Sequence, residues 1–346
     1  MAAAAAGTEA NAFDESFNQP TKTFLDRFTF GSYGELHSRV GDGSDNIDMH
    51  RLVGMLNFQV TDRVKLVSEV EFEHAFYWDE DGGDEGYEIE VEQAYAEFAL
   101  SDDLLLNTGI QLVPVGIINI THEPTTFYGV ERPNVEKYII PSTWWEGAVG
   151  MVKTYKSGLQ IDLMVHTAMD MMSDGYIRSG RPKLDLNEYT EDQNWAVTGR
   201  ARYTGISGIE LATTMQYQQD VSNAVSGDQS TFLAEGHAIY RKGGFEFRAL
   251  TAYWNVGGFD NSEIEDQWGY YLEPSYTFEI PWGEAGFFGR FSQYEYFNKT
   301  RRENLEYSIG ANYWPIDEVV LKVDYTYIDS NTGNNETVNF GLGYFF

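Results

Sequence analysis

Glutamates occur at every second position in two neighbouring segments of the sequence, the first of which reads VSEVEFEHAF (67–76). The six acids are Glu69, Glu71, Glu73, Glu88, Glu90 and Glu92. Side chains two residues apart lie on the same face of a β-strand. Carboxylates in such a row can bind cations or line a polar channel, but they repel one another unless they are hydrated, partnered or partly protonated. Their role therefore depends on the elements that position them.

The hydrophobic residues follow a period of two along almost the whole chain of 346 residues, and no segment sustains a period of 3.6. This pattern predicts sixteen strands in a single domain, residues 26–346. We interpret residues 1–25 as an N-terminal extension, either a cloning remnant or a trimmed mature start. The predicted strands span residues 27–40, 47–60, 64–78, 87–100, 104–113, 145–155, 159–168, 194–204, 208–219, 231–241, 245–254, 268–280, 285–297, 304–314, 319–329 and 336–346.

The connections between these strands alternate in character. Those after odd-numbered strands are long or acidic, such as DEDGGDEG (79–86), whereas those after even-numbered strands are short, such as TDR (61–63). This alternation is typical of a transmembrane barrel, with short turns on the periplasmic side and long loops outside. A soluble sandwich has no reason to sort its loops in this way. The sequence therefore predicts an all-β fold, a transmembrane antiparallel up-and-down β-barrel of 16 strands with both termini periplasmic.

The composition supports this class of protein. No run of apolar residues is long enough for a membrane helix, and the absence of cysteine excludes disulfides and Cys-based metal sites. The net charge of −31 argues against nucleic acid as a partner. Aromatic residues near strand ends predict girdles at the two membrane interfaces; they are Trp78, Tyr87, Trp145, Tyr155, Trp195, Tyr203, Tyr240, Tyr253, Trp268 and Tyr344.

Two features resemble Gram-negative outer-membrane porins. The chain ends in GLGYFF, so that Phe346 closes an alternating last strand, and a long segment (113–143) follows the fifth predicted strand. In porins that loop folds into the lumen and narrows it, which implies a pore-constricting loop here. The stretch GIQLVPVGIINITHEPTTFYGVERP (109–133) resembles the phosphate-selective porin O/P-like group. That group depends on a lysine ladder for anion selectivity, and this chain lacks one, so the resemblance implies the fold and a pore but not the phosphate preference.

In such a barrel the polar phase of each strand must face the lumen, because a charge on the lipid face costs about 2–4 kcal/mol at mid-depth. The six glutamates then form a lumen acidic stripe. A hairpin folded about DEDGGDEG places Glu73 opposite Glu92, and one folded about TDR brings Arg51 near Glu73. The predicted lumen basic wall consists of Arg39, Arg51, Arg200, Arg202, Arg248 and Arg290. The predicted residues of the constriction loop are Glu123, Glu131, Arg132, Glu136 and Lys137.

These charges suggest a transverse field that favours small polar solutes, although they could instead satisfy one another structurally. We expect an outer-membrane porin for passive diffusion of small hydrophilic solutes and ions, with a mild cation preference, surrounded by the lipid bilayer and lipopolysaccharide. The alternatives are a substrate-selective channel for phosphate or another anion, and a non-conducting structural or adhesive barrel. No histidine lies in a nucleophile motif, so we expect no enzymatic activity.

We expect no cofactor and no metal site. The acidic outer loops could hold weakly bound divalent cations, but DEDGGDEG lacks the ligand spacing of an EF-hand, which favours a solvated tip. Ser68 and His74 interrupt the apolar outward phase of their strand. A neighbouring subunit at this wall would explain them and favours a homotrimer packed through its early strands; a β-bulge that shifts the strand phase is the alternative.

Overall fold

The computed structural model describes residues 23–41, 45–80, 86–169, 177–180, 194–221, 229–257 and 266–346. In these residues seventeen strands form one antiparallel sheet. The first eight are β1 (Phe28–Gly41), β2 (Asn46–Thr61), β3 (Val64–Glu73), β4 (Tyr77–Asp79), β5 (Glu88–Ser101), β6 (Leu104–Leu112), β7 (Trp145–Thr154) and β8 (Leu159–Thr167). The other nine are β9 (Trp195–Ile206), β10 (Ile209–Gln218), β11 (Thr231–Lys242), β12 (Phe245–Val256), β13 (Asp266–Ile280), β14 (Gly283–Asn298), β15 (Thr300–Ile316), β16 (Val319–Ser330) and β17 (Asn335–Phe345).

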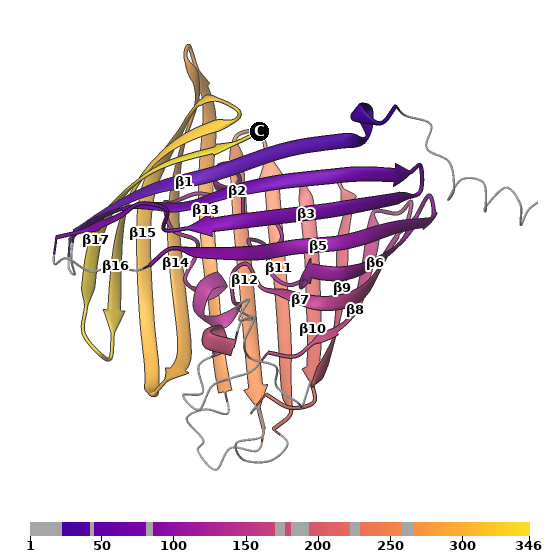
Figure 1. Ribbon diagram of the computed structural model, residues 1–346. Helices are drawn as coiled ribbons and strands as arrows, with labels where there is room; N and C mark the ends of the chain where they lie inside the picture. The colour runs from indigo at the N-terminus through magenta and orange to yellow at the C-terminus, as the bar shows by residue number, and fades with distance from the viewer. Residues whose placement is uncertain are drawn as a thin grey trace, which may run out of the picture.

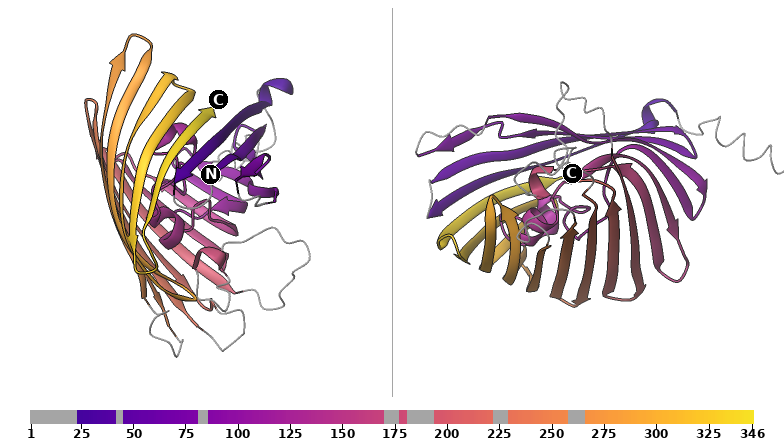
Figure 2. Two further views of the ribbon diagram at one scale, coloured as in Figure 1. Left: turned by 90° about the vertical axis from the view of Figure 1, so that its left-hand side faces the viewer. Right: turned by 90° about the horizontal axis from the view of Figure 1, so that it is seen from below.

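The sheet closes into a barrel where its first strand pairs with its last. β1 pairs with β17 from Tyr33 opposite Phe345 to Gly41 opposite Thr337. The backbone amides of Ser32 and Phe346 each donate to the other residue's carbonyl oxygen at 2.9 Å. Closure gives the two end strands a second neighbour, which removes the open edge that lipid cannot solvate. In Figure 1 the near-wall strands β1, β2, β3 and β5 cross in front of β11–β14, and the view from below shows the ring of strands (Figure 2).

The sixteen predicted strands are confirmed. With β3 and β4 taken together, every predicted strand boundary except the start of β15 lies within two residues of the observed one. The third predicted strand is divided into β3 and the short β4, which raises the count in the described residues to seventeen. The division lies at His74, where the backbone adopts a positive φ of 52° and β4 continues the pairing with β2. The predicted connection 298–303 is shorter than expected, because β14 and β15 extend until only Lys299 separates them.

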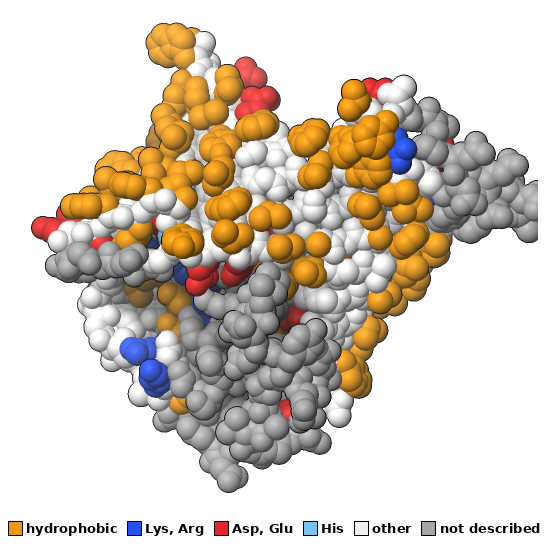
Figure 3. Space-filling model, in the orientation of Figure 1, with side chains coloured by type: hydrophobic (Ala, Val, Ile, Leu, Met, Phe, Trp, Pro, Cys, Tyr) orange, Lys and Arg blue, Asp and Glu red, His pale blue; other side chains and the backbone are white. Residues whose placement is uncertain are grey.

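The outer face of the barrel is apolar and the inner face carries the charges. On β11, for example, Phe232 and Tyr240 point outward and are 39% exposed, whereas Glu235 and His237 alternate with them and are buried. On the wall that faces the viewer in Figure 3, hydrophobic side chains (orange) are spread over the outer surface. This alternation follows from the cost of a charge in lipid. In the described part of the chain, no helix is long and apolar enough to cross a membrane.

The aromatic residues at strand ends agree with this arrangement, with one exception. Trp78, Tyr155 and Trp195 are 50%, 46% and 46% exposed, as expected for rings at a membrane interface. Trp145 at the start of β7 is only 5% exposed. Trp145 is therefore not part of a girdle. Its place in the alternating pattern of residues 145–155 did not predict that its side chain would be buried.

Candidate functional site

The long loop (113–144) between β6 and β7 folds into the barrel. It contains two short helical turns, η2 (Pro124–Thr126) and η3 (Val135–Ile139). Three arginines on separate strands hold its backbone by donating to carbonyl oxygens: Arg51 on β2 to His122 at 2.6 Å, Arg248 on β12 to Thr126 at 2.9 Å, and Arg290 on β14 to Tyr128 at 2.8 Å. The long loop after the fifth spanning strand is thereby confirmed inside the barrel, bonded to walls that face one another.

Apolar packing fixes the same loop against the far wall. Ile139 and Ile140 of the loop belong to one buried cluster with Leu250, Trp254 and Tyr271, which point inward from β12 and β13. The indole of Trp254 also donates to the carbonyl oxygen of Ile139 at 2.7 Å. The sequence interpretation named only charged residues for the lumen lining and did not predict that apolar side chains such as Leu250 and Tyr271 would pack there. These side chains face inward because apolar residues of the loop cover them on that side of the barrel.

Two glycines in the barrel wall leave room for the loop, because a side chain at either position would meet loop atoms. A Cβ atom at Gly343 would lie 2.5 Å from the Cβ atom of Pro124, and one at Gly269 would lie 3.1 Å from Ile139. The first separation is shorter than real carbon contacts allow, and the second is tighter than most of them. The position of the loop therefore depends on glycine in the wall as well as on Pro124 and Ile139 in the loop.

Glu136, one of the predicted constriction residues, lies inside the loop's own packing. Its carboxylate accepts hydrogen bonds from the backbone amides of Ile117 and Ile118 at 2.8 and 2.7 Å and from the Tyr271 hydroxyl at 2.7 Å. The side chain is fully buried. Burial raises the pKa of Glu136, and the three donors act in the opposite direction. Glu136 thus anchors the loop and does not face the pore.

The acidic stripe has a different register from the predicted one. Glu73 lies opposite Glu88, and Glu71 opposite Glu90, whereas Glu73 was expected opposite Glu92. A bulge after Glu69 accounts for one residue of this shift, because the pairing changes there from Glu69 with Gln93 to Val70 with Val91. Carboxylates therefore face each other directly. The predicted pairing of Arg51 with Glu73 across β2 and β3 is present.

Most of the stripe is enclosed behind the loop. Glu69, Glu71, Glu90 and Glu92 are between 0% and 3% exposed. The Nε2 atom of His122 lies 3.6 Å from a carboxylate oxygen of both Glu69 and Glu92, and the Tyr33 hydroxyl donates to Glu69 at 2.9 Å. Burial alone would lower the pKa of His122, but these two carboxylates raise it to about 9. The stripe faces a protonated loop histidine rather than an open lumen.

The predicted basic wall is not separate from the acids. Each of its members lies beside a carboxylate: Arg51 beside Glu35, Arg200 beside Asp162, Arg202 beside Glu210, Arg248 beside Glu246, Arg290 beside Glu273 and Arg39 beside Glu131. Apart from Glu131, the sequence interpretation missed these acids. The antiparallel register supplies two of them directly, since it places Glu35 opposite Arg51 and Asp162 opposite Arg200. Most of these arginines thus form ion pairs with acids on the same or a neighbouring strand. The predicted separation of acids and arginines on opposite walls is not observed for them.

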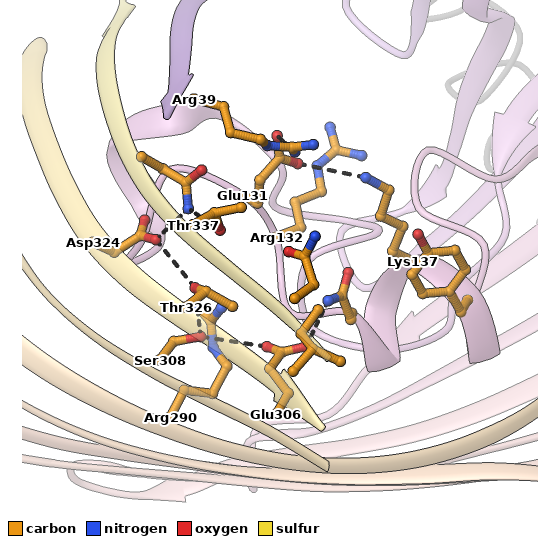
Figure 4. A pocket seen from close by; sticks show the side chains of 15 residues that line it. Arg39, Glu131, Arg132, Lys137, Arg290, Glu306, Ser308, Asp324, Thr326 and Thr337 are labelled. Atoms are coloured by element: carbon orange, nitrogen blue, oxygen red, sulfur yellow. Dashed lines mark hydrogen bonds and ion pairs between the residues drawn. The ribbon is translucent and has the colours of Figure 1, made fainter. Parts of the chain in front are cut away.

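A polar cavity of about 270 Å³ remains beside the loop, and we call it the charged chamber (Figure 4). Four basic and three acidic side chains line it: Arg39, Arg132, Lys137, Arg290, Glu131, Glu306 and Asp324. Glu131 lies between two of the cations, 3.5 Å from Arg39 and 3.6 Å from Lys137. The chamber therefore contains three of the five predicted constriction residues, and Glu123 is not among its lining residues.

A second cavity of about 240 Å³ borders a different part of the loop, Pro114 and Ile120. Its polar lining comes from residues nearer the short turns, such as Asn107 and Gln160. Space thus remains beside both ends of the loop, and its lining is polar in the charged chamber and mixed in the second cavity.

Comparison with known proteins places this geometry in context. No family model matches the sequence. An uncharacterized protein of Aquifex aeolicus (strain VF5) is 28% identical over 336 residues, which cover 86% of this chain and 74% of that protein.

Solved structures share the architecture at low identity. OmpF of Salmonella typhi, in complex with daunomycin, matches with a TM-score of 0.63 at 12% identity, covering 94% of this chain and 99% of that one. The anion-selective porin of Comamonas acidovorans matches with a TM-score of 0.59 at 9% identity, covering 92% and 99%. The trimer form of OmpT of Vibrio cholerae matches with a TM-score of 0.57 at 12% identity, covering 93% and 100%. These likenesses show that the chain has the porin fold.

Proposed function

We propose that this porin-fold chain is a channel of the Gram-negative outer membrane through which small hydrophilic solutes and ions diffuse passively. The observation that carries the proposal is the loop held inside a closed barrel with a charged chamber beside it. The apolar outer face suits lipid, and the alternation of long and short connections favours periplasmic termini. The role is that of a conduit, with no chemical step assigned to any side chain.

The charge distribution supports a mild cation preference. The chain carries 54 acidic and 23 basic residues, so counter-cations will be enriched around its mouths. The chamber itself is close to neutral, with four basic and three acidic side chains, which limits the preference. This small basic excess is also the observation that favours the second candidate, a channel selective for phosphate or another anion.

We also propose a homotrimer packed through the early strands. Phe30, Leu36 and Val40 of β1 are 73%, 37% and 46% exposed in the single chain, and a trimer packed through the early strands would cover them. Ser68 gives no support to this contact, because its hydroxyl already donates to the Leu56 carbonyl oxygen at 2.6 Å. Native mass spectrometry of the detergent-extracted protein tests the proposal. A mass of three chains is expected, and a single chain would contradict it.

Liposome swelling tests which solutes pass. Vesicles that contain the protein should swell in small sugars and amino acids at rates that fall steeply with solute size, because the loop narrows the barrel. Equal permeation of a disaccharide and a monosaccharide would contradict a constriction formed by the loop. No swelling above empty vesicles would support a non-conducting structural or adhesive barrel.

A further inference from the structure

Three potential metal ligands converge at the break between β3 and β4. The Nδ1 atom of His74 lies 3.0 Å from both carboxylate oxygens of Asp48, and the Nδ1 atom of His50 lies 3.2 Å from one of them. One ligand atom from each residue can be chosen so that all three lie within 4.8 Å of one another. Two imidazoles and a carboxylate therefore share one small volume on the inner face of the barrel.

The backbone is distorted at the residue that completes this group. His74 has a φ of 52°, in the left-handed region that side chains other than glycine seldom adopt. The distortion turns the His74 imidazole inward to Asp48, and not outward to lipid as the alternation of residues 64–78 predicts, while Tyr77 beyond the break again lies opposite Asp48. This settles the two explanations offered for His74 in favour of an irregular strand. Strain of this kind persists where the surrounding structure holds it, and it is concentrated at functional sites.

The separations suit a tetrahedral metal ion. Zinc bonds to imidazole nitrogen and carboxylate oxygen at about 2.0–2.2 Å, which at the tetrahedral angle places neighbouring ligand atoms about 3.3 Å apart. Asp48 lies at 3.0 and 3.2 Å from the two histidines. The side chains are sheltered but accessible, with 28% of His50 and 16% of His74 exposed. A set of two histidines and one carboxylate leaves the fourth position for water, as in zinc sites that keep one position open.

The surroundings hold the ligands in place and give an ion a path to them. The ring of His37 stacks on His50 with centroids 4.7 Å apart. A cavity of about 160 Å³ opens onto the group, and its lining includes Glu131, which also lines the charged chamber. A solute or ion in the chamber is therefore beside the three ligands.

We propose that Asp48, His50 and His74 form a binding site for a divalent transition-metal ion of the zinc type, next to the charged chamber. The ion would add two positive charges beside Glu131 and so reduce any cation preference of the channel. The sequence interpretation expected no metal site and placed His74 on the lipid face, whereas the observed backbone brings it to Asp48.

Isothermal titration of Zn²⁺ into the untagged, refolded protein in detergent tests the proposal. One strong site per chain is expected. The H50N and H74N variants should each weaken binding at least about tenfold, while H166N should leave it unchanged, because His166 lies at the Thr198 hydroxyl on another wall. Circular dichroism of each variant establishes that the barrel has formed. Equal affinity in the native protein, H74N and H166N would overturn the assignment.

Electron paramagnetic resonance of the Cu²⁺-loaded protein provides a second readout that does not depend on affinity. Hyperfine coupling to two imidazole nitrogens is expected in the native protein and to one in H74N. Coupling to none would overturn the site. Neither experiment requires conduction, so a failed channel and a failed metal site are distinguishable.

Discussion

The Arg51 guanidinium joins the near wall of the barrel to the inner loop. Its terminal nitrogen donates to the carbonyl oxygen of His122 at 2.6 Å, while its Nε atom donates to Glu35 at 2.5 Å. Arg51 is 1% exposed and Glu35 is 3% exposed. The loop is therefore fixed at this point by a buried ion pair, and its position depends on a group that cannot be removed without leaving a charge uncompensated.

Replacing Arg51 by Met should lower the free energy of unfolding by about 3–5 kcal/mol, because the buried Glu35 would keep only His37, whose Nε2 atom lies 3.1 Å away, beside it. Thermal unfolding in detergent measures the effect. Arg39→Met is the matched control, since the side chain of Arg39 is 42% exposed and an exposed pair contributes less than about 1 kcal/mol. Equal losses in the two variants would contradict the anchoring role.

Adding a methyl group at Gly343 should displace the loop. The new Cβ atom would lie 2.5 Å from the Cβ atom and 2.9 Å from the Cγ atom of Pro124, and overpacking of this kind costs about 1–3 kcal/mol. We expect Gly343→Ala to lower the melting temperature and to alter the single-channel conductance. Gly54→Ala serves as the control, because nothing lies within 4 Å of a Cβ atom there. Identical behaviour of both variants would show that the loop does not pack on this wall.

Selectivity should respond to the charged chamber more than to the acidic stripe. Glu131→Gln removes a charge from the chamber lining and should shift the reversal potential toward anions. Glu69→Gln with Glu71→Gln removes two charges that are only 3% and 1% exposed, and should change stability more than selectivity. Measuring the reversal potential of each variant under a salt gradient compares the contribution of the chamber with that of the stripe. A larger shift from the stripe pair would contradict the enclosed position of the stripe.

Stability should fall between neutral and high pH because of His122. Its pKa is raised to about 9 in the folded protein against an ordinary value of 6.5. A raised histidine pKa contributes stability that is fully present below the unfolded value and is lost as the pH rises through the folded one. The contribution is roughly 3 kcal/mol, lost between about pH 6.5 and 9. Melting temperatures at pH 7 and pH 10 measure it. The H122Q variant should show a smaller decrease, and an equal decrease would assign the effect to other groups.

The strands were predictable from the sequence because lipid imposes a strict alternation on each of them. Glu235 and His237 on β11 have to face inward for the same reason that Phe232 and Tyr240 have to face outward. The position of the long loop was predictable too, since it follows from strand count and resemblance.

The details that depend on tertiary contacts were not predictable. The bulge after Glu69 and the positive φ at His74 changed the register of the stripe and the direction of one histidine, and neither has a signature in the local sequence. The fold of the loop depends on Arg51, Arg248 and Arg290, which come from three distant strands. The tip of DEDGGDEG, residues 81–85, lies outside the described residues, so its weak binding of divalent cations stays a prediction.

Planar-bilayer recording of the purified protein under a salt gradient tests the central claim most directly. The account predicts discrete, uniform current steps and a reversal potential displaced slightly toward the cation equilibrium potential. The absence of steps from folded protein, compared with detergent alone, would contradict the assignment as a channel. Steps with an anion-selective reversal potential would contradict the charge argument and favour the alternative of an anion channel.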